Sequence, residues 1–96
     1  MTIEYRLDNR KYELCKKYVM PVYEGDKQGV TFDETLRVIS VNEDAADDFL
    51  DASDYAIIHY GMVNQDYLSP LGCELQFLYD EIYYQTKEQT KETGID

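Results

Sequence analysis

The segment Leu-Arg-Val-Ile-Ser-Val-Asn-Glu-Asp-Ala-Ala-Asp-Asp-Phe-Leu-Asp-Ala-Ser-Asp, residues 36–54, joins an apolar run to a strongly acidic one. Its first six residues are rich in β-branched side chains, which favours a strand over Leu36–Val41. In the acidic part, apolar residues recur at the spacing of one helix face, and Asn42 is a good N-cap. The segment therefore predicts a strand that leads directly into an acidic amphipathic helix near residues 43–54.

The polar face of this predicted helix is made almost entirely of carboxylates. At about 100° per residue, six of them fall within about 140° of each other, opposite the apolar side chains. They are Glu43, Asp44, Asp47, Asp48, Asp51 and Asp54. Carboxylates four residues apart repel by about 0.2–0.5 kcal/mol, so a helix with a purely structural role would more often carry lysines here. We therefore interpret the six carboxylates as a partner-binding surface.

The charge of the whole chain is as uneven as that of the helix. The 96 residues carry a net charge of −11, and no lysine or arginine occurs between Arg37 and Lys87. Large apolar residues are interleaved with the acids of this stretch, which indicates a folded body, residues 1–96 as one domain, and not a disordered acidic tail. Such a field repels nucleic acid and anionic lipid and attracts basic patches on other macromolecules.

The remaining patterns predict an α+β fold, with a small, mostly antiparallel sheet and about three helices. A helix starts after the N-cap residue Asp8 and ends at Pro21, with a strand over Tyr18–Tyr23 as the alternative. Around residues 24–29 a β-hairpin or a long polar loop fits. Alternation and apolar content predict two further strands, at Thr2–Leu7 and Tyr55–Tyr60.

A long C-terminal helix is predicted near residues 70–92, starting at Ser69 and Pro70. Leu71, Leu75, Leu78 and Ile82 form its inner face. Its last turns are polar all round, so residues 86–96 are expected to fray or project. Phe77 and Tyr84 form a second apolar stripe, which implies a second neighbour within the fold or a contact with a partner or a second copy. The second predicted contact set is Glu74, Phe77, Asp80, Glu81 and Tyr84.

No catalytic, cofactor or metal signature occurs in the sequence. His59 is the single histidine and lies in an apolar run, which favours a core or sheet position. Cys15 and Cys73 lack metal-ligand or CxxC spacing, which is typical of reduced thiols in a cytosol. Neither a glycine-rich phosphate loop nor a calcium loop is matched. No apolar run approaches the roughly 20 residues of a membrane span. We expect a cytoplasmic protein without enzyme activity, cofactor, metal or membrane contact.

The acidic face predicts imitation of a nucleic-acid backbone. Residues four apart on a helix are about 6 Å apart, comparable with neighbouring phosphates, and nucleic-acid-binding proteins neutralise phosphates with lysine and arginine. The expected function is a stoichiometric inhibitor or decoy that occupies the basic groove of such a protein and does not itself bind DNA or RNA. In size, acidity and tyrosine content the chain resembles the nucleic-acid-mimicking inhibitors of phages and mobile elements, which block CRISPR effectors, restriction enzymes or repair proteins. The alternatives are an immunity or antitoxin protein that neutralises a basic nuclease, and a plain acidic interaction or assembly module.

Overall fold

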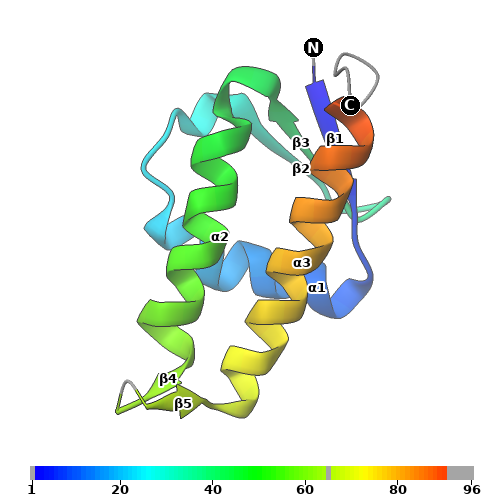
Figure 1. Ribbon diagram of the computed structural model, residues 1–96. Helices are drawn as coiled ribbons and strands as arrows, with labels where there is room; N and C mark the ends of the chain where they lie inside the picture. Colours follow the sequence, from blue (N-terminus) through cyan, green and yellow to red (C-terminus); the bar gives the residue numbers. More distant parts are fainter. Residues whose placement is uncertain (1, 65, 91–96) are drawn as a thin grey trace.

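The computed structural model describes residues 2–64 and 66–90 and has an α+β fold (Figure 1). Its elements in chain order are β1 (Thr2–Arg6), α1 (Asn9–Leu14), η1 (Cys15–Val19), η2 (Met20–Val22), η3 (Lys27–Gly29), β2 (Val30–Asp33), β3 (Val38–Asn42), η4 (Glu43–Ala45), α2 (Ala46–Gly61), β4 (Met62–Val63), β5 (Tyr67–Leu68) and α3 (Pro70–Thr90). The element η1 is a π-helical turn, and the other η elements are 3-10 turns. Helices α2 and α3 lie side by side, with α1 and the larger sheet behind them (Figure 1).

The larger sheet confirms the first predicted strand and the strand predicted before the acidic helix. Its order is β1-β3-β2, and both pairings are antiparallel. The register places Ile3 opposite Val41 and Tyr5 opposite Ile39, and all four side chains are fully buried. Cross-strand pairs of this kind are the unit that stabilises a sheet. The central strand β3 then delivers the chain into the acidic segment, as predicted.

The helix predicted after Asp8 is confirmed, and the alternative strand over Tyr18–Tyr23 is wrong. The carboxylate of Asp8 caps α1 by accepting a hydrogen bond of 2.8 Å from the backbone N–H of Lys11. The helix continues through η1 and η2, with Pro21 in its final 3-10 turn. Beyond it, a loop containing η3 leads to β2, so the hairpin of this region is formed by β2 and β3.

The strand predicted at Tyr55–Tyr60 is wrong, because these residues extend α2 to Gly61. A short apolar run has the same composition in a buried strand and in a buried helix, so its period decides. Here the buried positions follow a helical period and include Ala52, Ser53, Ala56 and Ile57. These mostly small residues form the inner face of α2. The helix is therefore longer than the acidic segment that starts it.

The start of α3 at Ser69 and Pro70 is confirmed. The Ser69 hydroxyl accepts a hydrogen bond of 3.0 Å from the N–H of Gly72, as an N-cap does, and donates one of 3.1 Å to the carbonyl of Gly61. The backbone N–H of Ser69 donates to the same carbonyl at 2.7 Å. Between the two helices lies a small hairpin of β4 and β5. The end of α2 and the start of α3 are thus joined directly.

The last turns of α3 pack along β1, although we expected residues 86–96 to fray. Thr86 shares a hydrogen bond of 2.7 Å with the hydroxyl of Tyr5, and Gln89 bonds to the backbone of Glu4. The helix continues to Thr90, and residues 91–96 lie outside the described part of the chain. Within that part, no helix has the length and apolarity required to cross a membrane.

Phe49 fixes the orientation of α2 on the sheet. Its ring stacks on Tyr5 of β1, with centroids 5.4 Å apart, and meets the edge of Tyr23 at 6.2 Å. All three rings are buried, and aromatic pairs at these distances add about 0.5–1.5 kcal/mol to their area burial. With Phe49 held inside, the opposite side of α2 faces solvent.

Candidate functional site

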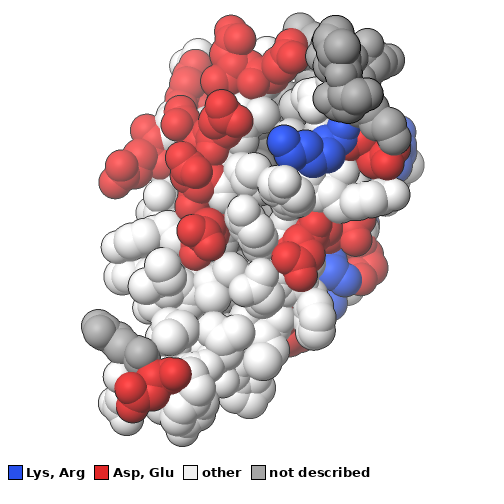
Figure 2. Space-filling model, viewed as in Figure 1, with Lys and Arg blue, Asp and Glu red and all other residues white. Residues whose placement is uncertain are grey.

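The six carboxylates predicted to form one surface lie together on the outer side of η4 and α2. The turn η4 carries Glu43 and Asp44, and the helix carries the other four. All six side chains are exposed, and the acidic side chains gather over the upper part of α2 (Figure 2). The opposite side of the same segment buries Ala45, Ala46 and Phe49. The amphipathic pattern in the sequence therefore corresponds to a real division between core and surface.

Within the described part of the chain, no ion pair neutralises this acidic surface. Among residues 2–64 and 66–90, none of the six side chains forms an ion pair or a side-chain hydrogen bond. Other carboxylates do form ion pairs, among them Arg6–Glu4, Arg10–Glu74, Lys11–Asp8 and Lys16–Glu34. Arg10, Lys11 and Lys16 thus pair with carboxylates that do not belong to the acidic surface.

A groove runs beside the acidic surface, between α2 and the segment Pro21–Gly25. This α2 groove has an open volume of about 860 Å³. Its α2 wall carries Asp48, Asp51 and Asp54, and the opposite wall carries Glu24. Carboxylates therefore stand on both sides of the hollow. Sequence reasoning missed Glu24, because the two walls are more than twenty residues apart in the chain.

The far end of the α2 groove is aromatic and apolar. Tyr55, Ile58 and His59 line it, and the first two are 50% and 59% exposed. The rings of Tyr55 and His59 stack with centroids 5.5 Å apart, and the His59 ring meets the edge of Tyr60 at 4.6 Å. His59 is exposed, so its predicted core or sheet position is wrong. The helical period through Ala56 was the signal that would have placed these residues outside.

The field of the carboxylates reaches the phenols on both flanks of α2. Burial raises the pKa of Tyr23, and the nearby Asp48 raises it further. On the α3 side, burial raises the pKa of Tyr79, with Asp54 as the next cause. Because a negative field disfavours a phenolate, both tyrosines remain neutral hydrogen-bonding groups at ordinary pH.

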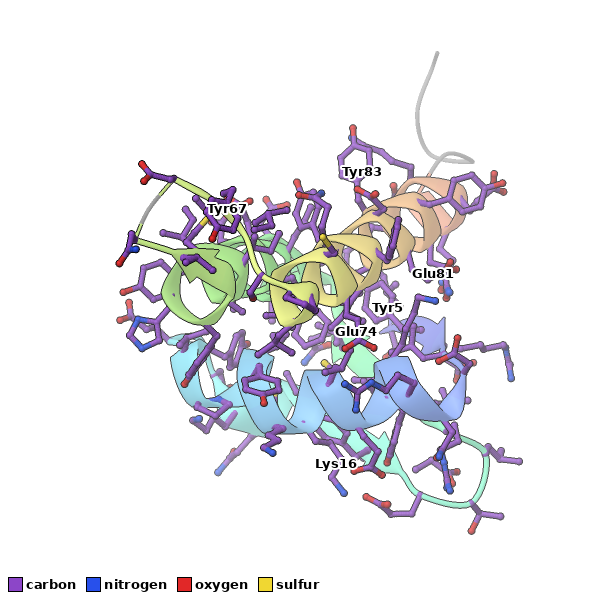
Figure 3. The ribbon with its side chains drawn as sticks, turned by 90° about the horizontal axis from the view of Figure 1, so that it is seen from below. Tyr5, Lys16, Tyr67, Glu74, Glu81 and Tyr83 are labelled. Carbon is purple, nitrogen blue, oxygen red and sulfur yellow. The ribbon has the colours of Figure 1, made fainter. Side chains whose placement is uncertain are left out.

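The second predicted contact set lies on α3 and is only partly free. The carboxylate of Glu74 points toward α1, and it accepts two hydrogen bonds from Arg10 at 2.8 and 2.6 Å (Figure 3). Glu81 accepts a hydrogen bond from Gln85, and Asp80 accepts one from Gln76.

Phe77 and Tyr84 are the free members of the second contact set. Their side chains are 62% and 61% exposed. The interpretation that α3 is sandwiched within the fold by this stripe is therefore wrong. The alternative, a contact with a partner or with a second copy of the chain, stays a prediction.

Metal-ligating side chains do not cluster among the described residues, and of the two thiols only Cys73 is accessible. In the ranges 2–64 and 66–90, no group of three or more His, Cys, Asp or Glu side chains is arranged to hold a metal ion. Both cysteines are free thiols. Cys15 is fully buried, which strongly raises the pKa of its thiol, whereas Cys73 is exposed on α3. A reactive cysteine needs a lowered pKa and access, and Cys15 has neither.

Comparison of the chain with protein-family models, curated proteins and solved structures finds no match. The acidic surface and the α2 groove are therefore the candidate functional features of the described residues.

Proposed function

We propose that the protein is an acidic, stoichiometric inhibitor that occupies the basic nucleic-acid-binding groove of another protein in the cytoplasm. One observation carries the proposal: six exposed carboxylates on η4 and α2 form no ion pair with a basic residue in the described part of the chain. Side chains four residues apart on a helix are about 6 Å apart, so they present a row of charges like that of phosphates. A groove that binds phosphates with lysine and arginine attracts such a row.

The cost of the arrangement supports a role in binding. Asp47 repels both Glu43 and Asp51 across one helical turn, by about 0.2–0.5 kcal/mol each. Lysines at these positions would relieve the repulsion and keep the surface soluble. An uncompensated acidic face is useful where its charge is neutralised by a partner, as in the inhibitors of CRISPR effectors and restriction enzymes that phages and mobile elements encode.

The first experiment isolates the partner and measures what the protein does to it. The protein is immobilised, incubated with cell lysate at low salt, and eluted with a salt gradient. The captured partner is then mixed with a labelled DNA or RNA duplex and increasing amounts of the protein. We expect a basic nucleic-acid-binding protein that loses its duplex as the protein approaches one equivalent.

The other outcomes point to other functions. A partner that holds the duplex and the protein at once contradicts mimicry and indicates a plain interaction module. A basic nuclease that loses cleavage but keeps duplex binding indicates an immunity or antitoxin protein. Direct binding of DNA or RNA by the protein at low salt would also contradict mimicry, because its net charge of −11 opposes phosphates over a Debye length of about 10 Å at 0.1 M salt.

Two charge-matched variants test the surface itself. The double substitution Asp47→Lys and Asp51→Lys reverses the centre of the acidic surface, and Glu13→Lys with Asp66→Lys makes the same change in net charge elsewhere. Both control positions are exposed. We expect the first variant to weaken partner binding by about tenfold or more, and the control to change mainly the association rate. Equal losses would show that net charge alone drives the contact.

A further inference from the structure

The α2 groove combines two features that the acidic surface alone lacks. Carboxylates line both of its walls, Glu24 on one side and the aspartates of α2 on the other. Its length from Asp48 to His59 is about 16 Å at 1.5 Å per residue, which an extended segment of about five residues spans. The groove therefore suits an inserted segment of a partner and not merely a flat contact.

The stacked rings of Tyr55 and His59 give the groove a flat aromatic site beside its carboxylates. Tyr55 is half exposed, and the His59 ring is held between it and the edge of Tyr60. A guanidinium group stacks on such faces and forks to carboxylates, and an ammonium group does neither as well. Ile58 and Pro21 supply apolar contact for the methylene stem of a long side chain.

Nucleic acid also has grooves with negative charge on both walls. A narrow minor groove has negative groups along both rims, and nucleic-acid-binding proteins insert arginine side chains into it. A partner that tracks such a groove carries the complementary arginine already. Anionic lipids, phosphates and nucleic acid itself are repelled by the four carboxylates.

We propose that the α2 groove binds an arginine side chain of the partner's nucleic-acid-binding surface, stacked against the Tyr55–His59 pair and paired with the carboxylates of the walls. This inference rests on the proposed function, because it names the group of the basic partner that enters this protein. It assigns to Tyr55, His59 and Glu24 a specificity role that net charge does not supply.

The test uses end-blocked hexa-arginine and hexa-lysine peptides, which have the same charge, with binding measured by calorimetry at two salt concentrations. We expect hexa-arginine to bind about three- to tenfold more tightly than hexa-lysine. Tyr55→Ala should remove most of this difference, and Glu24→Gln should weaken both peptides. The matched control is Tyr67→Ala, an exposed aromatic position on β5 that does not line the groove.

Chemical-shift mapping on the unaltered protein gives a readout that needs no variant. Hexa-arginine should shift the resonances of Tyr55, His59 and Glu24 more than those of Glu43 and Asp44. Equal affinities for the two peptides, or a loss in Tyr67→Ala as large as in Tyr55→Ala, would overturn the inference.

The two proposals fail in different ways. If Tyr55→Ala still inhibits the captured partner fully while the lysine variant of the acidic surface does not, the arginine site is wrong and the decoy function stands. If hexa-arginine binds at the groove but the protein never displaces a duplex from its partner, the groove stands and the decoy function is wrong.

Discussion

Gly61 and Gly72 bring the backbones of α2 and α3 into direct contact. A Cβ atom added to Gly72 would lie 2.2 Å from the carbonyl oxygen of Gly61, and one added to Gly61 would lie 2.4 Å from the Cα of Gly72. Both obstacles are backbone atoms, which cannot rotate away as a side chain can. Because Ser69 bonds to the same Gly61 carbonyl, one point fixes both the crossing of the helices and the start of α3.

The substitution Gly72→Ala should destabilise the protein, although the same change inside an exposed helix stabilises it by up to about 1 kcal/mol. The clash forces the helices apart, and overpacking of this kind costs about 1–3 kcal/mol. Urea unfolding measures the difference. Gly29→Ala is the control, because its nearest neighbours lie at 3.6 Å or more, so we expect it to be neutral or slightly stabilising. Equal stability of the two variants would contradict the close crossing.

Two glutamines of α3 act as the missing partner of the edge strand β1. Gln89 accepts a hydrogen bond from the N–H of Glu4 and donates one to its carbonyl, at 2.9 and 2.6 Å. Gln85 does the same with Arg6, at 2.9 Å for both bonds. An open edge strand is a template for unwanted pairing, and these amides close it.

Replacing Gln85 and Gln89 together by alanine should lower the free energy of unfolding by about 1–3 kcal/mol, because four hydrogen bonds to backbone are lost while helix propensity improves slightly. Hydrogen exchange is the sharper measurement, since the amides of Glu4 and Arg6 should lose protection. The control is Gln76→Ala, which removes a half-buried glutamine of the same helix whose amide donates to Asp80 and not to β1. Unchanged exchange at Glu4 would show that water replaces the amides without loss.

The sequence predicted those features that depend on neighbours along the chain. Asp8 and Ser69 cap their helices as expected, and the carboxylates around Asp47 lie outside because Phe49 and its neighbours must lie inside. Capping and amphipathic period are local rules that one sequence can indicate, but the predicted N-cap Asn42 makes no side-chain capping hydrogen bond and precedes the 3-10 turn η4.

What the sequence did not show depends on contacts between distant segments. Residues 55–60 were predicted as a strand because an apolar run does not reveal its period until its buried face is known, and the small residue Ala56 gave a weak signal. Because of that error, the sequence did not indicate that Tyr55 and His59 are exposed on a helix. Glu24 was missed because the loop that carries it is placed against α2 only by the folded core. The same limit applies to Gln89, whose partner lies 85 residues away.

The two thiols should differ sharply in reactivity. Burial of Cys15 raises the pKa of its thiol and blocks access, whereas Cys73 is exposed on α3. We expect iodoacetamide at pH 8 to modify Cys73 completely and Cys15 only after unfolding, because the thiolate is the reactive form. Peptide mass spectrometry identifies the modified residue. Rapid modification of Cys15 in the folded protein would mean that the core beneath α1 opens readily.

The exposed stripe of α3 predicts self-association. Phe77 and Tyr84 are both more than half exposed, and exposed apolar patches mark contact sites more often than free surface. Sedimentation should therefore show a larger species for the wild type than for Phe77→Glu. Leu36→Glu is the matched control, because Leu36 is 66% exposed in the turn between β2 and β3. Monomers in all three samples would contradict self-association through this stripe.

The last prediction concerns the cost that the acidic surface imposes on folding. Replacing Asp47 and Asp51 by lysine turns the repulsion between position 47 and Glu43, and between position 51 and Asp48, into attraction, while the two new lysines repel each other as the aspartates did. Each contact is worth about 0.2–0.5 kcal/mol, and a lysine in the first turn of α2 loses up to about 1 kcal/mol to the helix dipole. The melting temperature should therefore stay the same or rise slightly, even as partner binding collapses.

Added salt should stabilise the wild type more than the variant, because screening relieves the repulsion between the carboxylates. If the variant melts at a clearly lower temperature, the two aspartates stabilise the fold. If it binds its partner at wild-type strength, they serve only to keep the surface solvated.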